Sequence, residues 1–410
     1  MEHYDVAAVR RRFPALQAGA RGAGGVDLDG PAGTQVPASV IEAMADVHRL
    51  GISNHGGGFP TSDAADRITA EARSAVADLF NAGPEEIVFG QNMTSLTFSM
   101  SRALARDWTE GDEVVVTLLD HDANVAPWRL AAEDRGVIVR PVPFDAESGQ
   151  LDPEAVADVV GSRTRLIAVT HASNALGSVP AVQQIVDIAH RAGALSYVDA
   201  VHYTPHGIVD VAKLDTDFLV ASSYKFFGPH VGALYGKAEI LERLRAYKVV
   251  PAPDHGPEKW ETGTQSFESL AGVTAAVEHL ASAGEGDNRR DRIVSGQTAV
   301  RGHELGLIDR FLAGAAEIPG LRIYGITAPD QLAQRVPTFS VAIQGQHPEE
   351  TATTMRERGV YVRSGDYYAV GVMGHLGVQD RGGLLRIGFV QYTTRQEVDR
   401  TLDALAAAAG

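Results

Sequence analysis

Cysteine is absent from the 410 residues of this chain. The protein therefore forms no disulfide and supplies no thiolate ligand to zinc or an iron–sulfur cluster, and it has no thiol nucleophile. Positive charge is also scarce, because 36 lysines and arginines face 52 aspartates and glutamates and leave a net charge of −16. Such a charge repels polyanions, so nucleic acid is not an expected partner.

Long apolar runs are missing as well. No segment approaches the roughly 18 uninterrupted apolar residues of a membrane span. The amino-terminal sequence Met-Glu-His-Tyr-Asp also lacks the basic and apolar stretches of an export signal. We therefore expect a cytoplasmic protein with no membrane partner.

Nucleotide-binding signatures are weak. Residues 56–58 are all glycine, but no Lys-Ser or Lys-Thr pair follows them as in a phosphate-binding loop. No Gly-x-Gly-x-x-Gly follows the first expected strand either, which argues against a nicotinamide oxidoreductase.

Short apolar runs alternate with amphipathic segments over residues 26–237. Runs rich in Val, Ile, Leu and Tyr predict buried strands, and the segments between them predict helices. The alternation predicts an α/β fold with a mostly parallel sheet covered by helices. The expected strands are 86–89, 113–119, 166–170, 194–198, 218–221 and 231–235, and the expected helices include 62–80, 181–191 and 237–246.

The pattern changes beyond residue 268. A long helical stretch over residues 273–313 is followed by strand candidates at 322–324, 338–343 and 384–388. We expect a large domain over residues 26–268 and a smaller α+β domain over residues 269–410. Residues 1–25 are expected to form an amino-terminal segment that packs with the small domain.

Polar residues follow four of the expected strands. Because the carboxyl ends of parallel strands meet at one edge of a sheet, His121, Asn174, Asp199 and Lys225 are expected to surround one small molecule. Asp199 and Lys225, 26 residues apart, suit pyridoxal phosphate in particular. Its aldehyde needs a lysine amine with which to form a Schiff base, and its ring nitrogen needs a carboxylate. Taken singly, Asp199 is better explained by a strand-end cap and Lys225 by a solvated surface lysine.

An anion site is expected beside this pair. Residues 91–95, Gln-Asn-Met-Thr-Ser, lie where a strand gives way to a helix, and amides and hydroxyls at a helix start hold phosphate. An ordinary helix cap is the alternative. The candidate ligands of the phosphate are Met93, Thr94, Ser95, Ser222 and Tyr224.

Two histidines complete the candidate cofactor site. His121 would stack on the pyridine ring, and His202 would reach its phenolic oxygen. Asp120 and Asp122 flank His121, but no further ligand recurs at metal-binding spacing, so no metal is expected. The pair His202 and His206 is better explained by packing within a loop than by a pair of ligands.

At these residues the sequence resembles the class V aminotransferase family of fold-type I pyridoxal-phosphate enzymes, and within it the cysteine desulfurases of the selenocysteine-lyase kind. The resemblance rests on the opening Leu-Asp-Gly-Pro-Ala at residues 28–32, the Asp-His-Asp-Ala-Asn motif that begins at residue 120, residues 170–177 and the spacing from Asp199 to Lys225.

The resemblance implies roles for further residues. Asn174 and Arg386 would bind the substrate carboxylate, and Arg363 and Tyr368 would lie near the substrate. Thr264 would reach the phosphate bound to a neighbouring subunit, which implies a homodimer with shared active sites. A surface salt bridge is the alternative for Arg386.

Three positions depart from the desulfurase pattern. His202 replaces a glutamine, Tyr224 replaces a histidine, and Tyr368 stands where the desulfurases carry their persulfide-forming cysteine. Desulfuration through an enzyme persulfide is therefore excluded.

Several functions remain open at this point. We expect a lyase that eliminates a substituent from Cβ of an amino acid, for example by cleaving a carbon–sulfur bond. Aminotransfer and epimerisation use the same lysine and aspartate and are the alternatives, and an inactive cofactor-binding scaffold is the non-enzymatic one.

Overall fold

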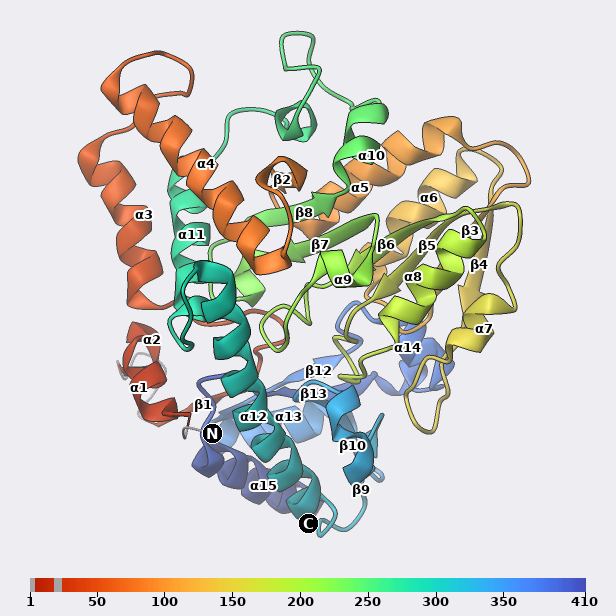
Figure 1. Ribbon diagram of the computed structural model, residues 1–410. Helices are drawn as coiled ribbons and strands as arrows, with labels where there is room; N and C mark the ends of the chain where they lie inside the picture. Colours follow the sequence, from red (N-terminus) through yellow and green to blue (C-terminus); the bar gives the residue numbers. More distant parts are fainter. Residues whose placement is uncertain (1–3, 18–23) are drawn as a thin grey trace.

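The computed structural model describes residues 4–17 and 24–410. A seven-stranded sheet with the order β2-β8-β7-β6-β5-β3-β4 forms the centre of the larger part in Figure 1. The strands from β7 to β4 pair in parallel, whereas β8 runs antiparallel to both of its neighbours. The expected mostly parallel sheet is confirmed. Its strands are β2 (Ile87–Gly90), β3 (Glu113–Thr117), β4 (Ile138–Val142), β5 (Thr164–Thr170), β6 (Leu195–Asp199), β7 (Phe218–Ser222) and β8 (Gly232–Gly236).

Both faces of this sheet are covered, because successive strand residues point to opposite sides. In β7, Phe218 and Val220 pack into the core under α5, α6 and α10, while Leu219 and Ala221 pack under α4, α8 and α11. A strand buried on both faces is apolar throughout, which made it recognisable in the sequence. The helices are α4 (Pro60–Phe80), α5 (Met93–Leu104), α6 (Ala126–Glu133), α8 (Val182–Arg191), α10 (Ala238–Arg243) and α11 (Phe267–Ala281).

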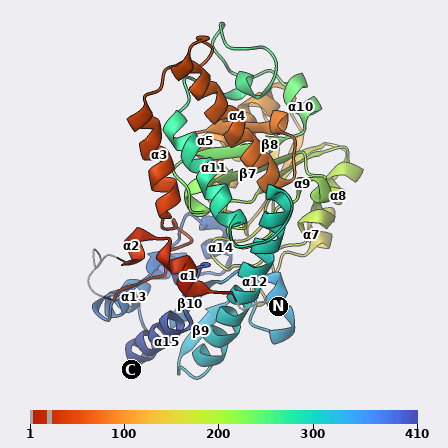
Figure 2. The same ribbon diagram turned by 60° about the vertical axis from the view of Figure 1, so that its left-hand side comes forward.

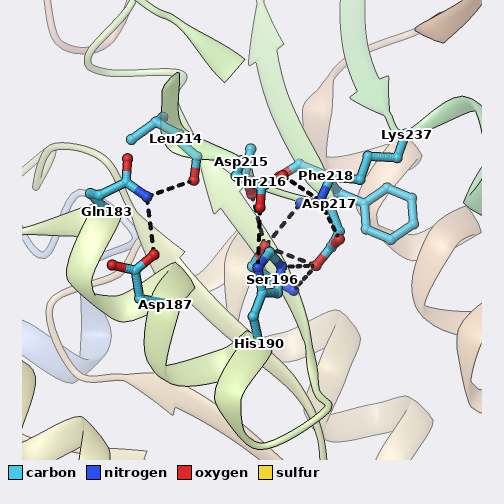
Figure 3. Close-up of polar contacts among 10 residues, drawn as sticks. All are labelled: Gln183, Asp187, His190, Ser196, Leu214, Asp215, Thr216, Asp217, Phe218 and Lys237. Atoms are coloured by element: carbon cyan, nitrogen blue, oxygen red, sulfur yellow. Dashed lines mark hydrogen bonds and ion pairs between the residues drawn. The ribbon is translucent and has the colours of Figure 1, made fainter. Parts of the chain in front are cut away.

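A buried polar cluster fixes β6 and β7 at their amino ends (Figure 3). Asp217 accepts hydrogen bonds from the Ser196 amide at 2.8 Å and the Ser196 hydroxyl at 3.1 Å, and it contacts His190 Nε2 at 3.0 Å. Lys237 completes the cluster with an ion pair of 3.1 Å to the same carboxylate. The cluster holds the two strands in register, so that their carboxyl ends lie at fixed positions at the opposite edge.

The smaller part lies below the large sheet in Figure 1. It has a four-stranded antiparallel sheet with the order β12-β13-β10-β9 and a parallel pair of β1 with β11. An apolar core between these strands and their helices contains Phe311, Phe339 and Phe389. The elements are β1 (Val26–Asp27), β9 (Leu321–Tyr324), β10 (Thr338–Ile343), β11 (Val360–Tyr361), β12 (Arg363–Gly365), β13 (Leu384–Gly388), α12 (Arg289–Ala315), α13 (Pro348–Glu357), α14 (Val370–His375) and α15 (Arg395–Ala409).

The helical stretch expected over residues 273–313 consists of two helices, α11 and α12. Asn288 caps α12 by accepting a hydrogen bond from the amide of Asp291. Glycines at 284 and 286 interrupt the helical pattern between the two. The domain boundary proposed at residue 268 falls in the first turn of α11, which packs against α3 (Ala38–Leu50) and α4.

The strands β4, β11 and β12 were not predicted. β4 lies at an edge of the large sheet and is mostly exposed, so its sequence lacks the continuous apolar run of its neighbours. Four short helices complete the fold: α1 (Val6–Arg11), α2 (Pro14–Gln17), α7 (Pro153–Ala157) and α9 (Val211–Leu214).

The amino-terminal helix α1 lies beside the smaller part of the molecule, as Figure 2 shows. Arg10 forms an ion pair of 2.8 Å with Glu397 of α15 and donates to the carbonyl of Tyr392 at 2.7 Å. Residues 1–3 and 18–23 of the proposed amino-terminal segment lie outside the described residues. Within residues 4–17 and 24–410, no helix has the length and apolar character needed to cross a bilayer.

Candidate active site

A cavity of about 830 Å³ opens where the large sheet meets the small domain. Its walls come from the start of α5, the loops after β3, β5 and β7, and the segment that includes β12. The side chains on its walls include Thr94, Phe98, His121, Asn174, Tyr224, Lys225, Arg363, Asp366, Tyr368 and Arg386. The cavity thus gathers residues from both domains.

Lys225 lies at the base of this cavity, in a short 3-10 turn directly after β7. Its amine is buried and donates a hydrogen bond to the carbonyl of Pro31. Burial, reinforced by the positive charge of Arg386, lowers the pKa of Lys225 to about 7. At neutral pH a substantial fraction of a lysine with this pKa is the free amine, which is a nucleophile and proton acceptor. Because Lys225 is buried, the solvated-surface interpretation is wrong.

Asp199 is the last residue of β6, the strand next to the one that leads to Lys225. Its Oδ1 accepts a hydrogen bond of 2.9 Å from the amide of Val201. Burial raises the pKa of Asp199 to about 6, although the Val201 amide and the charge of Lys225 oppose the shift. Because this buried carboxylate accepts one hydrogen bond from Val201, it can still accept another from a protonated ring nitrogen.

His121 presents a neutral imidazole to the same cavity. Its Nδ1 accepts a hydrogen bond of 3.0 Å from the Ala123 amide, which leaves the proton on Nε2. Burial lowers the pKa of His121 to about 4, and the charges of Lys225 and Arg386 act in the same direction. The ring of Tyr368 stacks against it, with 5.6 Å between centroids and an interplanar angle of 22°.

Asp120, next to His121, is buried, and the sequence did not predict a catalytic or binding role for it. It accepts hydrogen bonds from the side-chain Nδ2 of Asn124 at 2.6 Å and from the Thr117 hydroxyl. Burial and the nearby Asp199 raise the pKa of Asp120 to about 8. Its hydrogen bonds fix the turn that carries His121.

The start of α5 provides a set of donors suited to an anion. Asn92 caps the helix by accepting from the Ser95 amide at 2.9 Å, so Ser95 serves the cap and Thr94 lines the cavity. The Met93 amide donates to Ser222 Oγ at 2.9 Å, which leaves the Ser222 hydroxyl proton for another acceptor. The helix start lies so close to β8 that a Cβ added at Gly232 would stand 2.4 Å from the Asn92 carbonyl carbon, so this position requires glycine.

Arg386 and Asn174 form a second polar group in the cavity. Arg386 Nη1 donates to the Asn174 carbonyl at 3.2 Å, and its guanidinium carbon lies 4.6 Å from the centre of the Tyr367 ring. Among the described residues, Arg386 Nε and Asn174 Oδ1 are buried without a hydrogen-bond partner. A bound carboxylate would satisfy the guanidinium N–H, which would otherwise cost free energy to bury.

Arg363 and Arg386 share a partner that the sequence reasoning missed. The Asp29 carboxylate accepts hydrogen bonds from both Nε and Nη2 of Arg363, and its Oδ1 lies 3.3 Å from Arg386 Nη2. Arg386 is therefore buried in a network and is not a surface salt bridge. Two arginines assigned to one small site require a carboxylate nearby to balance their charge. The presence of this pair in the sequence could therefore have predicted an acidic partner such as Asp29.

The segment from Asp366 to Tyr368 closes one side of the cavity in an unusual conformation. Tyr367 and Tyr368 both have left-handed backbones, with φ of 54° and 57°. Asp366 stabilises this turn by accepting a hydrogen bond of 2.9 Å from the Tyr368 amide. The Tyr368 side chain is 71% exposed, so it stands at the mouth of the cavity.

Three predicted cofactor contacts are arranged differently from the others. The His202 Nε2 contacts Thr338 Oγ1 at 2.9 Å, so this nitrogen already has a partner in the small domain. The Tyr224 ring lines the cavity but also stacks on His230 with 4.8 Å between centroids. Thr264 lies in a separate hollow with Tyr247 and Val249, away from the Lys225 of its own chain.

The residues that line the cavity, together with the buried Asp199 at the end of β6, fit pyridoxal phosphate. A buried neutral lysine suits its aldehyde, a buried aspartate suits its ring nitrogen, and the hydroxyls at the start of α5 suit its phosphate. The orphaned guanidinium N–H of Arg386 suits the carboxylate of an amino acid attached to it.

Comparison with known proteins agrees with this geometry. Residues 26–401 match the family model for class-V aminotransferases. Two similar curated proteins are a cysteine desulfurase from Pectobacterium carotovorum, 31% identical, and an aminotransferase-like protein from Gibberella zeae, 32% identical. The alignments cover 98% of this chain in both cases, with 97% of the first relative and 98% of the second.

A solved structure with the same architecture is the apo form of a cysteine desulfurase from Thermococcus onnurineus. It superposes with a TM-score of 0.87 at 27% sequence identity, over 98% of this chain and 97% of the other. The agreement extends over both domains, so the relation concerns the whole fold.

Proposed function

Because the chain belongs to the class-V aminotransferase family and is thereby a pyridoxal-phosphate enzyme, we propose that it is a lyase that eliminates a substituent from Cβ of an amino acid. The favoured substrate is a cysteine whose sulfur carries a substituent. The single observation that carries this proposal is the pairing of Lys225 with Arg386 in one cavity of a chain that contains no cysteine.

The residues of the cavity have distinct tasks in this proposal. Pyridoxal phosphate supplies an electron-accepting ring that weakens the bonds at the substrate Cα. Arg386 and Asn174 bind the α-carboxylate and orient the substrate, and Asp199 keeps a proton on the ring nitrogen. Thr94 and Ser222 hold the phosphate, and the neutral ring of His121 packs on the cofactor face.

Lys225 attaches the cofactor and then acts as the base. Its low pKa lets the free amine accept the Cα proton at neutral pH. The Cβ–S bond then breaks and the sulfur leaves with the bonding electron pair as a thiolate, which is protonated. Hydrolysis of the remaining three-carbon unit gives pyruvate and ammonia.

The sulfur-accepting step of a desulfurase has no counterpart in this chain. Where the resemblance places the cysteine nucleophile, the chain has Tyr368, whose phenol cannot form a persulfide. The Tyr368 ring instead stacks on His121 at the cavity mouth. Retention of the amino-acid site without the thiol favours release of the sulfur compound to solvent.

We further propose that the protein is a cytoplasmic homodimer whose active sites include Thr264 of the partner chain. Thr264 lines the same hollow as Val249, which is 71% exposed, and Val250, the next residue in the chain, is 94% exposed. Exposed neighbouring apolar side chains favour burial against another protein surface. Sedimentation of the purified protein tests the assembly, and Thr264→Ala in a true dimer should weaken cofactor binding.

The lyase proposal is tested with S-methylcysteine. The expected products are methanethiol, pyruvate and ammonia in equal amounts, and Lys225→Ala should form none of them. A keto acid formed without ammonia, with the amino group passed to an added keto acid, would identify an aminotransferase. The covalent role of Lys225 has an independent test: after borohydride reduction, the peptide that contains Lys225 should carry the mass of the cofactor.

A further inference from the structure

Two positively charged side chains lie directly opposite each other beside the cavity. In the antiparallel pairing of β12 with β13, Arg363 and Arg386 are register partners. Opposite residues in such a pair project from the same face of the sheet, and like charges there repel. A third group must offset this repulsion, and Asp29 is the carboxylate that contacts both guanidinium groups.

Asp29 divides its two contacts unequally. It occupies both Nε and Nη2 of Arg363, the fork that a carboxylate ligand would use. With Arg386 it makes one contact of 3.3 Å, which leaves the buried Nε without a partner among the described residues. Arg386 is thus open to a carboxylate, whereas Arg363 is already filled from within the chain.

Exposure points the same way. The side chain of Arg363 is 52% exposed, so without Asp29 its fork would be reachable from the cavity that it lines. Asp29 is 26% exposed and comes from the segment after β1, which pairs with β13 at Gly388. This backbone pairing fixes the carboxylate between the two arginines.

We propose that Asp29 determines the substrate class of this site, restricting it to amino acids that carry a single carboxylate. The inference rests on the proposed function, in which Arg386 binds the α-carboxylate. Two guanidinium groups and one internal carboxylate leave one positive charge uncompensated, which matches one α-carboxylate. A second substrate carboxylate would meet an arginine fork that Asp29 occupies, and it would also face the negative charge of Asp29.

A purely structural role for Asp29 makes a different prediction. If Asp29 only relieves repulsion between the arginines, its replacement lowers stability and weakens all carboxylate ligands to a similar degree. If it determines substrate class, its replacement changes the ratio of affinities for ligands with one and two carboxylates. The ratio therefore separates the two roles.

The test measures propionate and glutarate binding to the cofactor-loaded protein by calorimetry. The unaltered protein should bind glutarate no more tightly than propionate. In Asp29→Asn, and more so in Asp29→Ala, the affinity for glutarate relative to propionate should rise at least about tenfold, the gain expected from one added charged contact. Asp29→Glu retains the charge and should stay near the original ratio.

Two controls sharpen the result. Asp399→Asn removes the carboxylate from another two-pronged pair, with Arg310, and should leave the ratio unchanged. Adding Arg363→Gln to Asp29→Asn should abolish the gain, because the fork that binds the second carboxylate is gone. Turnover offers a parallel readout, in which Asp29→Asn should favour S-carboxymethylcysteine over S-methylcysteine.

The failure of this inference is distinguishable from failure of the proposed function. An unchanged ratio in Asp29→Asn and Asp29→Ala, with propionate still bound, overturns the role of Asp29 and leaves the carboxylate site intact. The role of Asp29 is also overturned if the unaltered protein binds glutarate tenfold more tightly than propionate. This outcome can be measured even if the variants do not fold. Absence of binding of both probes to all forms overturns both proposals.

Discussion

The two walls of the cavity are built in different ways. The wall that carries Lys225 is formed by the ends of buried parallel strands, where Asp199 and Ser222 are also buried. The opposite ends of these strands are fixed by the Asp217 cluster. The other wall is formed by β12, β13 and the following turn, where Tyr367 and Tyr368 have left-handed backbones and Arg363 is half exposed. One wall is held by regular structure and the other by side-chain contacts.

This difference matters for function. Chemistry common to a family needs a few groups at fixed positions, which strand ends provide. The choice of substrate and reaction can change with single residues of a loop, such as the one that carries Tyr368 in this cavity. The comparison predicts severe losses from changes in the first wall and graded or selective effects from changes in the second.

The largest effect is expected at Lys225. Lys225→Ala removes both the covalent attachment and the base, so turnover should fall on the order of 10,000-fold. Lys225→Arg is the matched control, because it keeps a long side chain with nitrogen donors but cannot act as a nucleophile or base at neutral pH. Turnover of either variant within tenfold of the original would contradict the prediction that changes in the first wall cause severe losses.

Asp199 should come next. Asp199→Asn keeps the shape and the hydrogen bond from Val201 but removes the charge that stabilises a protonated ring nitrogen. We expect kcat to fall on the order of 100- to 1,000-fold, the range for loss of one preorganised electrostatic contact. Because the cofactor should still bind, cofactor content measured after gel filtration serves as the control.

The first wall is also the part that sequence reasoning predicted in most detail. Six of the seven strands of the large sheet were placed within a few residues, because strands buried on both faces are continuously apolar. Their end positions then brought His121, Asn174 and Lys225, three of the four expected residues, to one cavity, whereas Asp199 is buried and does not line it. Their catalytic roles remain predictions.

The second wall was only partly predictable. β12 is three residues long and has no apolar run, and the left-handed turn at Tyr367 and Tyr368 contains no glycine to signal it. The contacts of Asp29 with Arg363 and Arg386 join residues more than 300 positions apart. Such contacts depend on strand register, which a single sequence does not reveal.

Arg386 joins the two walls electrostatically, and its removal should alter both. Arg386→Gln should raise KM for the amino acid on the order of 100-fold, because a charge-assisted carboxylate contact is lost. Its positive charge also lowers the pKa of Lys225. In the variant that pKa rises above about 7, so less free amine is present at neutral pH and cofactor attachment to the stripped protein should shift to higher pH.

The pH dependence of attachment can be followed by absorbance after pyridoxal phosphate is added. In the unaltered protein the rate should increase through about pH 7 and then level off. An unchanged midpoint in Arg386→Gln would show that burial alone sets the pKa. As a matched control, Arg310→Gln removes a guanidinium whose described ion pair is with Asp399, and it should not move the midpoint.

The smallest effect concerns the strained turn itself. Tyr368 adopts a positive φ that costs a residue with a side chain on the order of 1 kcal/mol relative to glycine. Tyr368→Gly relieves this cost but also removes the ring stacked on His121 and gains chain entropy in the unfolded state. Because the ring is mostly exposed, the lost stacking is small, and the free energy of unfolding should change by less than about 1 kcal/mol.

Tyr368→Ala removes the ring without relieving the backbone and should be the less stable of the two in urea unfolding. If Tyr368→Ala were instead as stable as the glycine variant, the turn would be held by its hydrogen bond to Asp366 at no net conformational cost, and the contrast between the two walls would lie in their contacts alone.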